Sequence, residues 1–271
     1  MRRAIGLDVG GSRLRAGLVL VEEGAIIARH AASLGEDKSP ARVVEAIASA
    51  VEGFGVPGVP LGIGFAAIFR GRDGLVANSP NHGWRDVPLG RLLADRLGRP
   101  FVLENDLTMI TWGEQRFGGG HGVADVACVY VGTGVGSGAV VGGRLLRGAT
   151  HSAPEVGHVK VVPGGALCGC GQRGCLEAYV GGRTLGESPD WARAGALLGL
   201  ALGNLVTTLN PARLVMGGSV WLGQPQLRAR THETIRETAL EAALAAVTVV
   251  DTEIGDDAGV LGAADLAAIG G

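Results

Sequence analysis

Three cysteines and a histidine lie close together in the chain, in a pattern that could hold a metal ion. Cys168, Cys170 and Cys175 fall within eight positions, and His158 lies ten residues before the first of them. The Cys-Gly-Cys spacing is poor for a disulfide, and three cysteines leave one unpaired. Three thiolates and an imidazole form the tetrahedral ligand set of closed structural zinc sites. Because the spacing differs from common zinc fingers, a cluster of reduced thiols in a loop is the alternative.

Two glutamates, Glu155 and Glu177, flank this cluster. Exposed glutamates are usually solvated surface residues. A metal-bound loop would hold them at a defined position, where they could bind a polar ligand.

A polar run, Glu104-Asn105-Asp106, stands where a strand pattern ends and a helical pattern begins. Asn and Asp are preferred residues at helix N-termini, so capping alone explains them. A carboxylate at the end of a strand can also accept a proton from a substrate hydroxyl. Both roles are compatible with the same dipeptide.

Two glycine-rich segments each follow one strand pattern and lead into another, at residues 8–12 and 132–138. Glycine lets backbone N–H groups approach an anion closely, as in phosphate-binding loops. Neither segment has the lysine of a Walker loop or opens a helix, as a dinucleotide fingerprint does. Tight turns are the alternative, but Asp8 could hold a metal through water and favours a pair of phosphate-binding loops.

Hydrophobic periodicity predicts an alternation of strands and helices around these motifs. Strands are predicted at 4–9, 14–21, 25–30, 59–66, 101–104, 126–131, 139–146, 213–216 and 247–251. Helices are predicted at 40–52, 89–97, 106–117, 192–209, 230–246 and 257–269. Strand, glycine turn and strand occur at residue 4 and again at residue 126, which indicates an internal duplication.

The composition excludes several classes of protein. With 46% hydrophobic and 18% charged residues among 271, the chain is neither disordered nor an acidic tail. A net charge of −2 with dispersed basic residues argues against a nucleic-acid surface. The longest apolar run, residues 194–203, is half of the roughly 20 residues that a membrane span needs. We expect a cytoplasmic protein with reduced cysteines.

The motifs occur together in an order that resembles the ROK family (repressors, open reading frames and kinases), in particular its glucokinase-like sugar kinases. The matching segments are DVGGS (8–12), END (104–106), VGTGVGSG (131–138), EVGH (155–158), CGCGQRGCLE (168–177), LVMGG (214–218) and GDDAG (255–259). The cysteine block with its upstream histidine is the most specific of these, and the glycine loops are the least.

The resemblance implies an α/β protein with a two-lobed actin-like ATPase (ribonuclease H-like) fold and a cleft between the lobes. The implied small lobe is 1–107 with a C-terminal helix at about 257–271, and the implied large lobe is 108–256 with a zinc-binding loop. The implied activity is ATP-dependent phosphorylation of a hexose, glucose first, at the 6-hydroxyl. Mg²⁺ and structural Zn²⁺ are the implied cofactors, and a homodimer without nucleic acid or membrane partners is the implied state.

Carried over position by position, the resemblance implies a role for each motif residue. Asp106 resembles the catalytic base. The residues that resemble sugar ligands are Asn81, Asn105, Asp106, Glu155, His158 and Glu177. Those that resemble the nucleotide site are Asp8, Gly10, Gly11, Ser12, Gly132, Thr133, Gly134, Gly217 and Gly218. The implied zinc ligands are His158, Cys168, Cys170 and Cys175.

Some positions depart from the family pattern and leave the substrate open. Ala66-Ala67 stands where a glycine-containing sugar loop is usual, Pro154 precedes Glu155, and the segment 183–191 is short. The alternatives are a kinase for fructose, mannose or N-acetylglucosamine, or a sugar-binding member without catalysis. A DNA-binding repressor would need a helix-turn-helix before the first glycine loop, where only seven residues precede Asp8.

Overall fold

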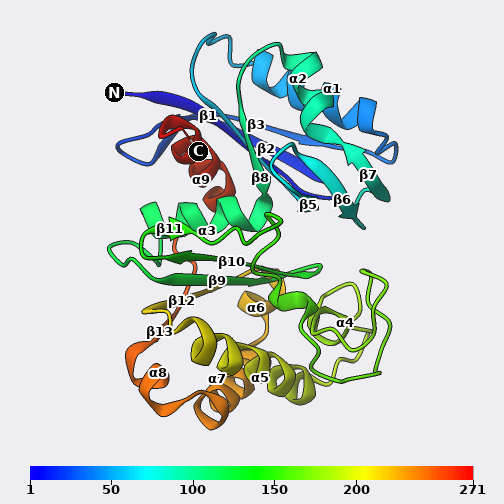
Figure 1. Cartoon of the computed structure of the whole chain (residues 1–271), viewed down its shortest axis with the longest axis vertical. Coiled ribbons are helices and arrows are strands. Elements are labelled where there is room, and N and C mark those ends of the chain that lie inside the picture. The colour runs from blue at the N-terminus through cyan, green and yellow to red at the C-terminus, as the bar shows by residue number, and fades with distance from the viewer. Residues whose placement is uncertain (271) are drawn as a thin grey trace. The chain divides into compact units, whose positions relative to one another are not determined.

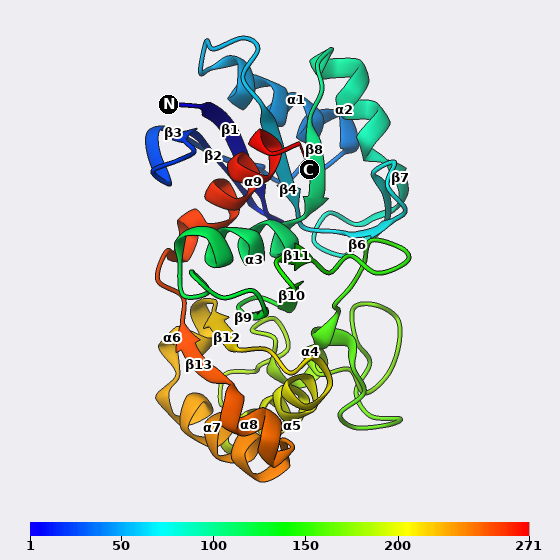
Figure 2. The ribbon, with the colours of Figure 1, turned by 60° about the vertical axis from the view of Figure 1, so that its left-hand side comes forward.

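The computed structural model describes residues 1–270 and divides the chain into two compact units, drawn in Figures 1 and 2. The first unit comprises residues 1–118, 147–153 and 256 onward, and the second comprises 119–146 and 154–255. The first unit extends to Gly118, beyond the limit of 107 implied by the resemblance, because helix α3 (Asp106–Phe117) packs on helix α9 (Ala258–Ala268). At this contact a Cβ on Gly262 would lie 1.8 Å from the Met109 carbonyl oxygen.

The first unit is built on a five-stranded sheet in the order β3-β2-β1-β4-β8. Its strands are β1 (Arg3–Val9), β2 (Arg13–Leu20), β3 (Ala25–Ser33), β4 (Leu61–Phe65) and β8 (Val102–Asn105). Strands β1, β4 and β8 are parallel, and their last residues Val9, Phe65 and Asn105 are in register. The segments that follow these three strands therefore emerge at one edge of the sheet.

Helices α1 (Pro40–Glu52) and α2 (Leu89–Leu97) complete the first unit with α3 and α9. Helix α1 begins at the predicted residue with proline in its first turn, where the missing N–H costs nothing. Its buried residues Val43, Ile47 and Val51 recur at helical spacing and pack into the core. A small sheet of β5 (Ile68–Arg70), β6 (Leu75–Ser79) and β7 (Trp84–Pro88) was not predicted from the sequence.

The second unit repeats the sheet topology of the first, in the order β11-β10-β9-β12-β13. Its strands are β9 (Val126–Val131), β10 (Val135–Val141), β11 (Arg144–Leu145), β12 (Arg213–Gly217) and β13 (Thr248–Asp251). Strand β9 pairs with β10 in an antiparallel hairpin and with β12 in parallel, and β12 pairs in parallel with β13. In the first unit, β1 pairs in the same way with β2 and β4, and β4 with β8. This common plan agrees with the predicted internal duplication.

The helices of the second unit are α4 (Glu177–Val180), α5 (Trp191–Leu209), α6 (Ser219–Gly223), α7 (Pro225–Thr238) and α8 (Glu241–Ala246). Short 3-10 turns occur at η1 (Val156–His158) and η2 (Gly255–Asp257), the latter ending in the first unit. Helix α5 is long and apolar enough to cross a membrane by length and composition. Its residues Leu198, Leu202 and Val206 are fully buried in the second core, as in the central helix of a globular domain.

Two sequence predictions in the second unit are wrong. The returning strand begins at Val135 rather than 139, because glycines 136 and 138 join the ladder opposite Tyr130 and Cys128. The helix predicted at 230–246 is two helices, since the chain becomes extended at Ala239 and Leu240.

Candidate functional site

At the start of helix α3, the residue that caps the helix is not the residue whose carboxylate could accept a proton. The Asn105 carboxamide oxygen accepts hydrogen bonds from the N–H groups of Leu107 at 2.8 Å and Thr108 at 3.2 Å, so Asn105 is the helix N-cap. Its amide nitrogen donates to the Ala67 carbonyl oxygen at 3.0 Å. The Asp106 carboxylate, one residue on, accepts from the Leu107 N–H at 2.9 Å.

Burial raises the pKa of Asp106 to about 7, and the negative charge of Asp8 adds to the shift, against hydrogen bonding from the Leu107 N–H. Burial likewise raises the pKa of Asp8, while its ion pair with Arg15 opposes the rise. The Arg15 guanidinium lies 3.3 Å from an Asp8 carboxylate oxygen and 2.8 Å from one of Asp256. A carboxyl group that titrates near neutrality can accept a proton from a substrate and release it again.

The first glycine loop lies against the segment that carries Asn81. The Gly10 N–H donates to the Arg13 carbonyl oxygen at 2.9 Å, which closes the turn. A Cβ on Gly11 would lie 2.6 Å from the Asn81 Cβ, so only glycine fits there. Ser12, at the end of this turn, is exposed and its carbonyl oxygen accepts from the Leu34 N–H at 3.0 Å.

The pair Ala66-Ala67, where the family usually has a glycine loop, is fixed through its backbone. The Ala66 N–H donates to the Val9 carbonyl oxygen at 2.9 Å, and the Ala66 carbonyl oxygen accepts from the Ser79 hydroxyl at 2.8 Å. With the Asn105 contact to Ala67, these bonds join the ends of β1, β4 and β8 and the Asn81 segment. Within the first unit, the predicted residues Asp8, Gly10–Ser12, Asn81, Asn105 and Asp106 thus share one edge of the sheet.

In the second unit, Glu177 joins the glycine loop to the cysteine cluster. Its carboxylate accepts from the Val135 N–H at 3.0 Å, and a Cβ on Gly134 would lie 2.5 Å from the same oxygen. The other carboxylate oxygen lies 3.7 Å from the Cys168 sulfur. The carbonyl oxygens of Gly132 and Thr133 accept from the N–H groups of residues 182 and 183, which fixes the loop further.

Gly217 ends strand β12 close to strand β9, and Gly218 follows it. A Cβ on Gly217 would lie 2.5 Å from the Tyr130 ring. Gly218 has a φ of +90°, and a Cβ there would lie 2.4 Å from the Val131 carbonyl oxygen. Both positions therefore require glycine. The turn lies at the same end of the sheet as the loop that begins at Gly132.

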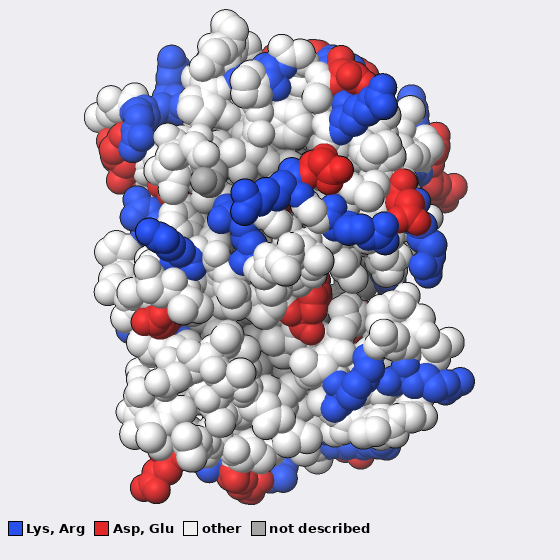
Figure 3. All heavy atoms as spheres, viewed as in Figure 1, with Lys and Arg blue, Asp and Glu red and all other residues white. Residues whose placement is uncertain are grey.

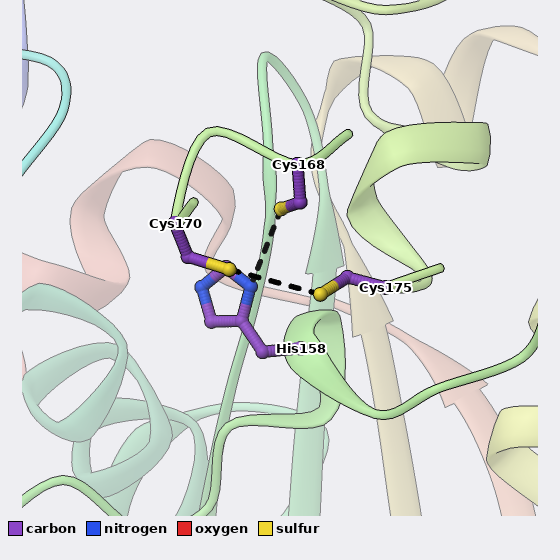
Figure 4. Close-up of side chains that lie close together, drawn as sticks. All are labelled: His158, Cys168, Cys170 and Cys175. Carbon is purple, nitrogen blue, oxygen red and sulfur yellow. Dashed lines mark hydrogen bonds between the residues drawn. The ribbon is translucent and has the colours of Figure 1, made fainter. Parts of the chain in front are cut away.

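His158, Cys168, Cys170 and Cys175 come together with their potential ligand atoms within 4.8 Å of one another, as Figure 4 shows. The Cys168 sulfur lies 3.7 Å from the His158 Nδ1, and the Cys170 sulfur lies 3.7 Å from the Cys175 sulfur. The three cysteines are free thiols. In a tetrahedral site with zinc–sulfur bonds of about 2.3 Å, neighbouring sulfurs are about 3.8 Å apart.

The His158 ring has its two nitrogens in different surroundings. Nδ1 faces the cysteines, and Nε2 lies 4.0 Å from a Glu155 carboxylate oxygen. Burial lowers the pKa of His158, which favours the neutral imidazole that a metal requires. Within the second unit, the structure thus gathers Glu155, His158, Glu177 and the three cysteines.

The sequence pattern left open whether Trp84 anchors the core or lines a pocket, and it missed His82, which is buried beside Trp84. The His82 ring stacks on Phe65 at 4.7 Å, and Trp84 stacks on the same ring at 5.3 Å. Burial, with the charge of Lys38, lowers the pKa of His82 to about 4. The signal was present in the polar run 78–83, which precedes Trp84 and includes Asn81.

Comparison with known proteins supports the resemblance along the whole chain. A glucokinase of Streptomyces coelicolor is 44% identical over 187 residues, which span 68% of this chain and 58% of that protein's length. A glucokinase of Thermotoga maritima is 30% identical over 309 residues, covering 97% of this chain and 96% of that protein.

Among solved structures, the chain is similar to a ROK family glucokinase of Streptomyces griseus in complex with glucose and AMPPNP. The TM-score is 0.85 at 32% identity, with 99% of this chain and 100% of that chain covered. This likeness confirms the predicted fold class, two α/β lobes of the actin-like ATPase type. The sequence pattern of the ROK family matches residues 4–190 and 188–269. The chain therefore belongs to the ROK family.

Proposed function

We propose that the protein is an ATP-dependent sugar kinase that phosphorylates glucose at the 6-hydroxyl, with Asp106 as the general base. The observation that carries this proposal is the Asp106 carboxylate, which follows the Asn105 cap and has a pKa of about 7. The named glucokinases of Streptomyces and Thermotoga, and the glucose complex of the Streptomyces griseus enzyme, support glucose as acceptor.

In the proposed reaction, Asp106 accepts the proton of the 6-hydroxyl while that oxygen attacks the γ-phosphorus of ATP. The bond to the β–γ bridging oxygen breaks, and ADP leaves with that electron pair. The carboxylate lies in surroundings that disfavour its charge, so protonation is favourable there. Such transfer depends mainly on positioning and charge stabilisation.

The remaining polar residues would bind the two substrates. Asn81, Asn105, Glu155, His158 and Glu177 offer the carboxylate, amide and imidazole groups that bind sugar hydroxyls. A missing hydroxyl would leave one of these groups without its partner, and this mismatch gives selectivity.

The glycine loops would bind the nucleotide. The glycines among residues 10–12, 132–134 and 217–218 would let backbone N–H groups approach the phosphates closely. Asp8 would hold Mg²⁺, directly or through water, and its partly buried carboxylate fits a hard cation. When bound, the ion would neutralise part of the negative charge of the phosphates.

We further propose that the cysteine cluster holds one structural zinc ion. The support is the donor set of His158 Nδ1 and three sulfurs, with spacings of 3.7 Å that fit tetrahedral edges. The Lys160 ammonium, 3.0 Å from the Cys175 sulfur, offsets the negative charge of three thiolates. Four protein ligands leave no open position, so the ion would stabilise the loop rather than react.

An ATP-consumption assay with Mg²⁺ across glucose, mannose, fructose and N-acetylhexosamines tests the kinase proposal. We expect turnover on glucose to exceed that on the other sugars. Turnover confined to an N-acetylated sugar would show that this sugar, and not glucose, is the substrate. An absence of turnover on every sugar by folded protein would contradict the proposal of a sugar kinase. The homodimer remains a prediction from the family resemblance, and the cytoplasmic location remains a prediction from the sequence composition.

A further inference from the structure

A cavity lies within the first unit, and none of the proposed site residues lines it. Its volume is about 440 Å³, within the range of roughly 300–1,000 Å³ found for small-molecule sites. Its apolar wall includes Phe69, Phe101 and Leu103, and its polar side chains are Arg72, Glu104, Arg147 and His151.

Arg147 is anchored at this cavity by a buried carboxylate. Its Nε donates to a Glu104 carboxylate oxygen at 2.6 Å, and Glu104 is only 8% exposed. A guanidinium has five N–H donors, so this contact leaves its Nη groups available. Within residues 1–270 no other side chain bonds to the Arg147 guanidinium.

Arg72 and His151 add further donors to the cavity. The Arg72 Nε donates to His151 Nε2 at 3.0 Å, so the neutral imidazole carries its proton on Nδ1 and can donate it. The described residues place no carboxylate within 4 Å of the Arg72 guanidinium. Glu104 compensates one of the two arginines, and one positive charge stays unpaired.

The segment that carries His151 is fixed to the cavity. The Gly71 N–H donates to the Thr150 carbonyl oxygen at 3.1 Å, and the Ala153 N–H donates to the Arg147 carbonyl oxygen at 3.1 Å. Figure 3 shows arginine and lysine side chains gathered on the drawn face of the first unit, with a few acidic ones among them. The donors therefore have a defined arrangement in the cavity.

We propose that this cavity is a binding site for a small phosphate-bearing anion. Two guanidinium groups and an imidazole N–H match the tetrahedral acceptors of a phosphate, and arginine favours such bidentate contacts. The apolar wall of Phe69 and Phe101 leaves room for the carbon skeleton of a phosphate ester. Inorganic diphosphate and a hexose phosphate share the recognised chemistry.

Calorimetric titration of the full chain with diphosphate, and separately with glucose 6-phosphate, tests this proposal in the wild type, Arg72→Gln and Arg91→Gln. Arg72 is exposed, so its replacement should leave the fold intact, which thermal unfolding verifies. Arg91 lies on α2 with 83% of its side chain exposed and does not line the cavity, so it is the matched control. Other anion sites contribute equally to all three proteins.

We expect Arg72→Gln to lose one anion site, or at least tenfold in its affinity, while Arg91→Gln binds as the wild type does. Tighter binding of glucose 6-phosphate than diphosphate would assign the site to sugar phosphates, and the reverse to inorganic anions. Equal binding by the wild type and Arg72→Gln would overturn the proposal, as would an equal loss in Arg91→Gln. Glucose phosphorylation without added anion should be unchanged in Arg72→Gln.

Discussion

Asp106 stands at the first position of α3, next to a cap that satisfies the helix N-terminus without it. Asn105 accepts from the N–H groups of Leu107 and Thr108, so the Asp106 carboxylate is not needed to cap the helix. The proposed base can therefore exchange a proton without unfolding the first turn.

Replacing Asp106 with Asn tests its role as base. The amide keeps the size and an acceptor for the Leu107 N–H but cannot take a proton. We expect kcat to fall by about 10²–10⁴-fold, with the dissociation constant for glucose changed only slightly. Initial rates and calorimetry measure the two quantities. Asp95→Asn on exposed α2 is the control, and a normal kcat in Asp106→Asn would rule out the base assignment.

The pH dependence of kcat/KM follows from the same residue. A base must be deprotonated, and burial raises the pKa of Asp106 to about 7, so activity should rise as pH increases from 5 to 8 and then level. In Asp8→Asn, the loss of one negative charge should move the midpoint of the residual activity to lower pH. Initial rates at saturating Mg²⁺ measure both profiles, and a flat profile from pH 5 to 8 would contradict this.

Residue types and order identified the candidate groups, but not their electrostatics. The END run could be placed at a strand–helix junction from its pattern alone. The raised pKa of Asp106 depends on burial and on Asp8, nearly a hundred positions away in the chain. The stacking of His82 on Phe65 is also a tertiary contact that no local pattern shows.

At the scale of elements, the loop that holds the cysteine cluster should depend on its metal. We expect about one zinc per chain by elemental analysis of purified wild-type protein. Cys175→Ser should lose most of it and unfold at a lower temperature, because Cys175 is fully buried and one of four ligands. Cys128→Ala, which removes a cysteine outside the cluster, should retain the metal. Zinc-free wild type with unimpaired sugar binding would refute the proposed site.

The contact of α3 with α9 requires glycine where the two backbones meet. A Cβ on Gly262 would lie 1.8 Å from the Met109 carbonyl oxygen, so Gly262→Ala must separate the helices. We expect it to lower the free energy of unfolding by about 3 kcal/mol, as for overpacked cores. Urea denaturation measures the loss. At Gly223 an added Cβ meets nothing within 4 Å, so Gly223→Ala should change stability little, and equal losses in both variants would contradict the packing account.

Elements whose apolar residues recur at a regular spacing could be predicted from the sequence. Elements whose limits depend on pairing between strands could not. Helix 40–52 has its apolar residues at helical spacing and a proline at its start. Strand β10 starts four residues early because glycines join the ladder, although glycine alone gives no strand signal. The break after Thr238 is marked by neither glycine nor proline, so the periodicity runs through it.

At the scale of the whole molecule, the two units have sheets of the same topology. Each has an antiparallel hairpin around a glycine loop, followed by two parallel strands. The repeat of strand, glycine turn and strand was enough to predict this duplication. The unit limits were less predictable, because α3 and α9 are far apart in sequence. They meet only in the folded chain, through close glycine contacts and the hydrogen bond from the Trp112 Nε1–H to the Asp265 carboxylate.

Identification of the product by ³¹P NMR tests the proposed activity most directly. Purified protein with glucose, ATP and Mg²⁺ should yield glucose 6-phosphate and ADP in equal amounts. The Asp106→Asn variant, treated identically, should form both products at least about a hundredfold more slowly. Phosphate released to water in place of the sugar ester, or a phosphate on a different hydroxyl, would contradict the account.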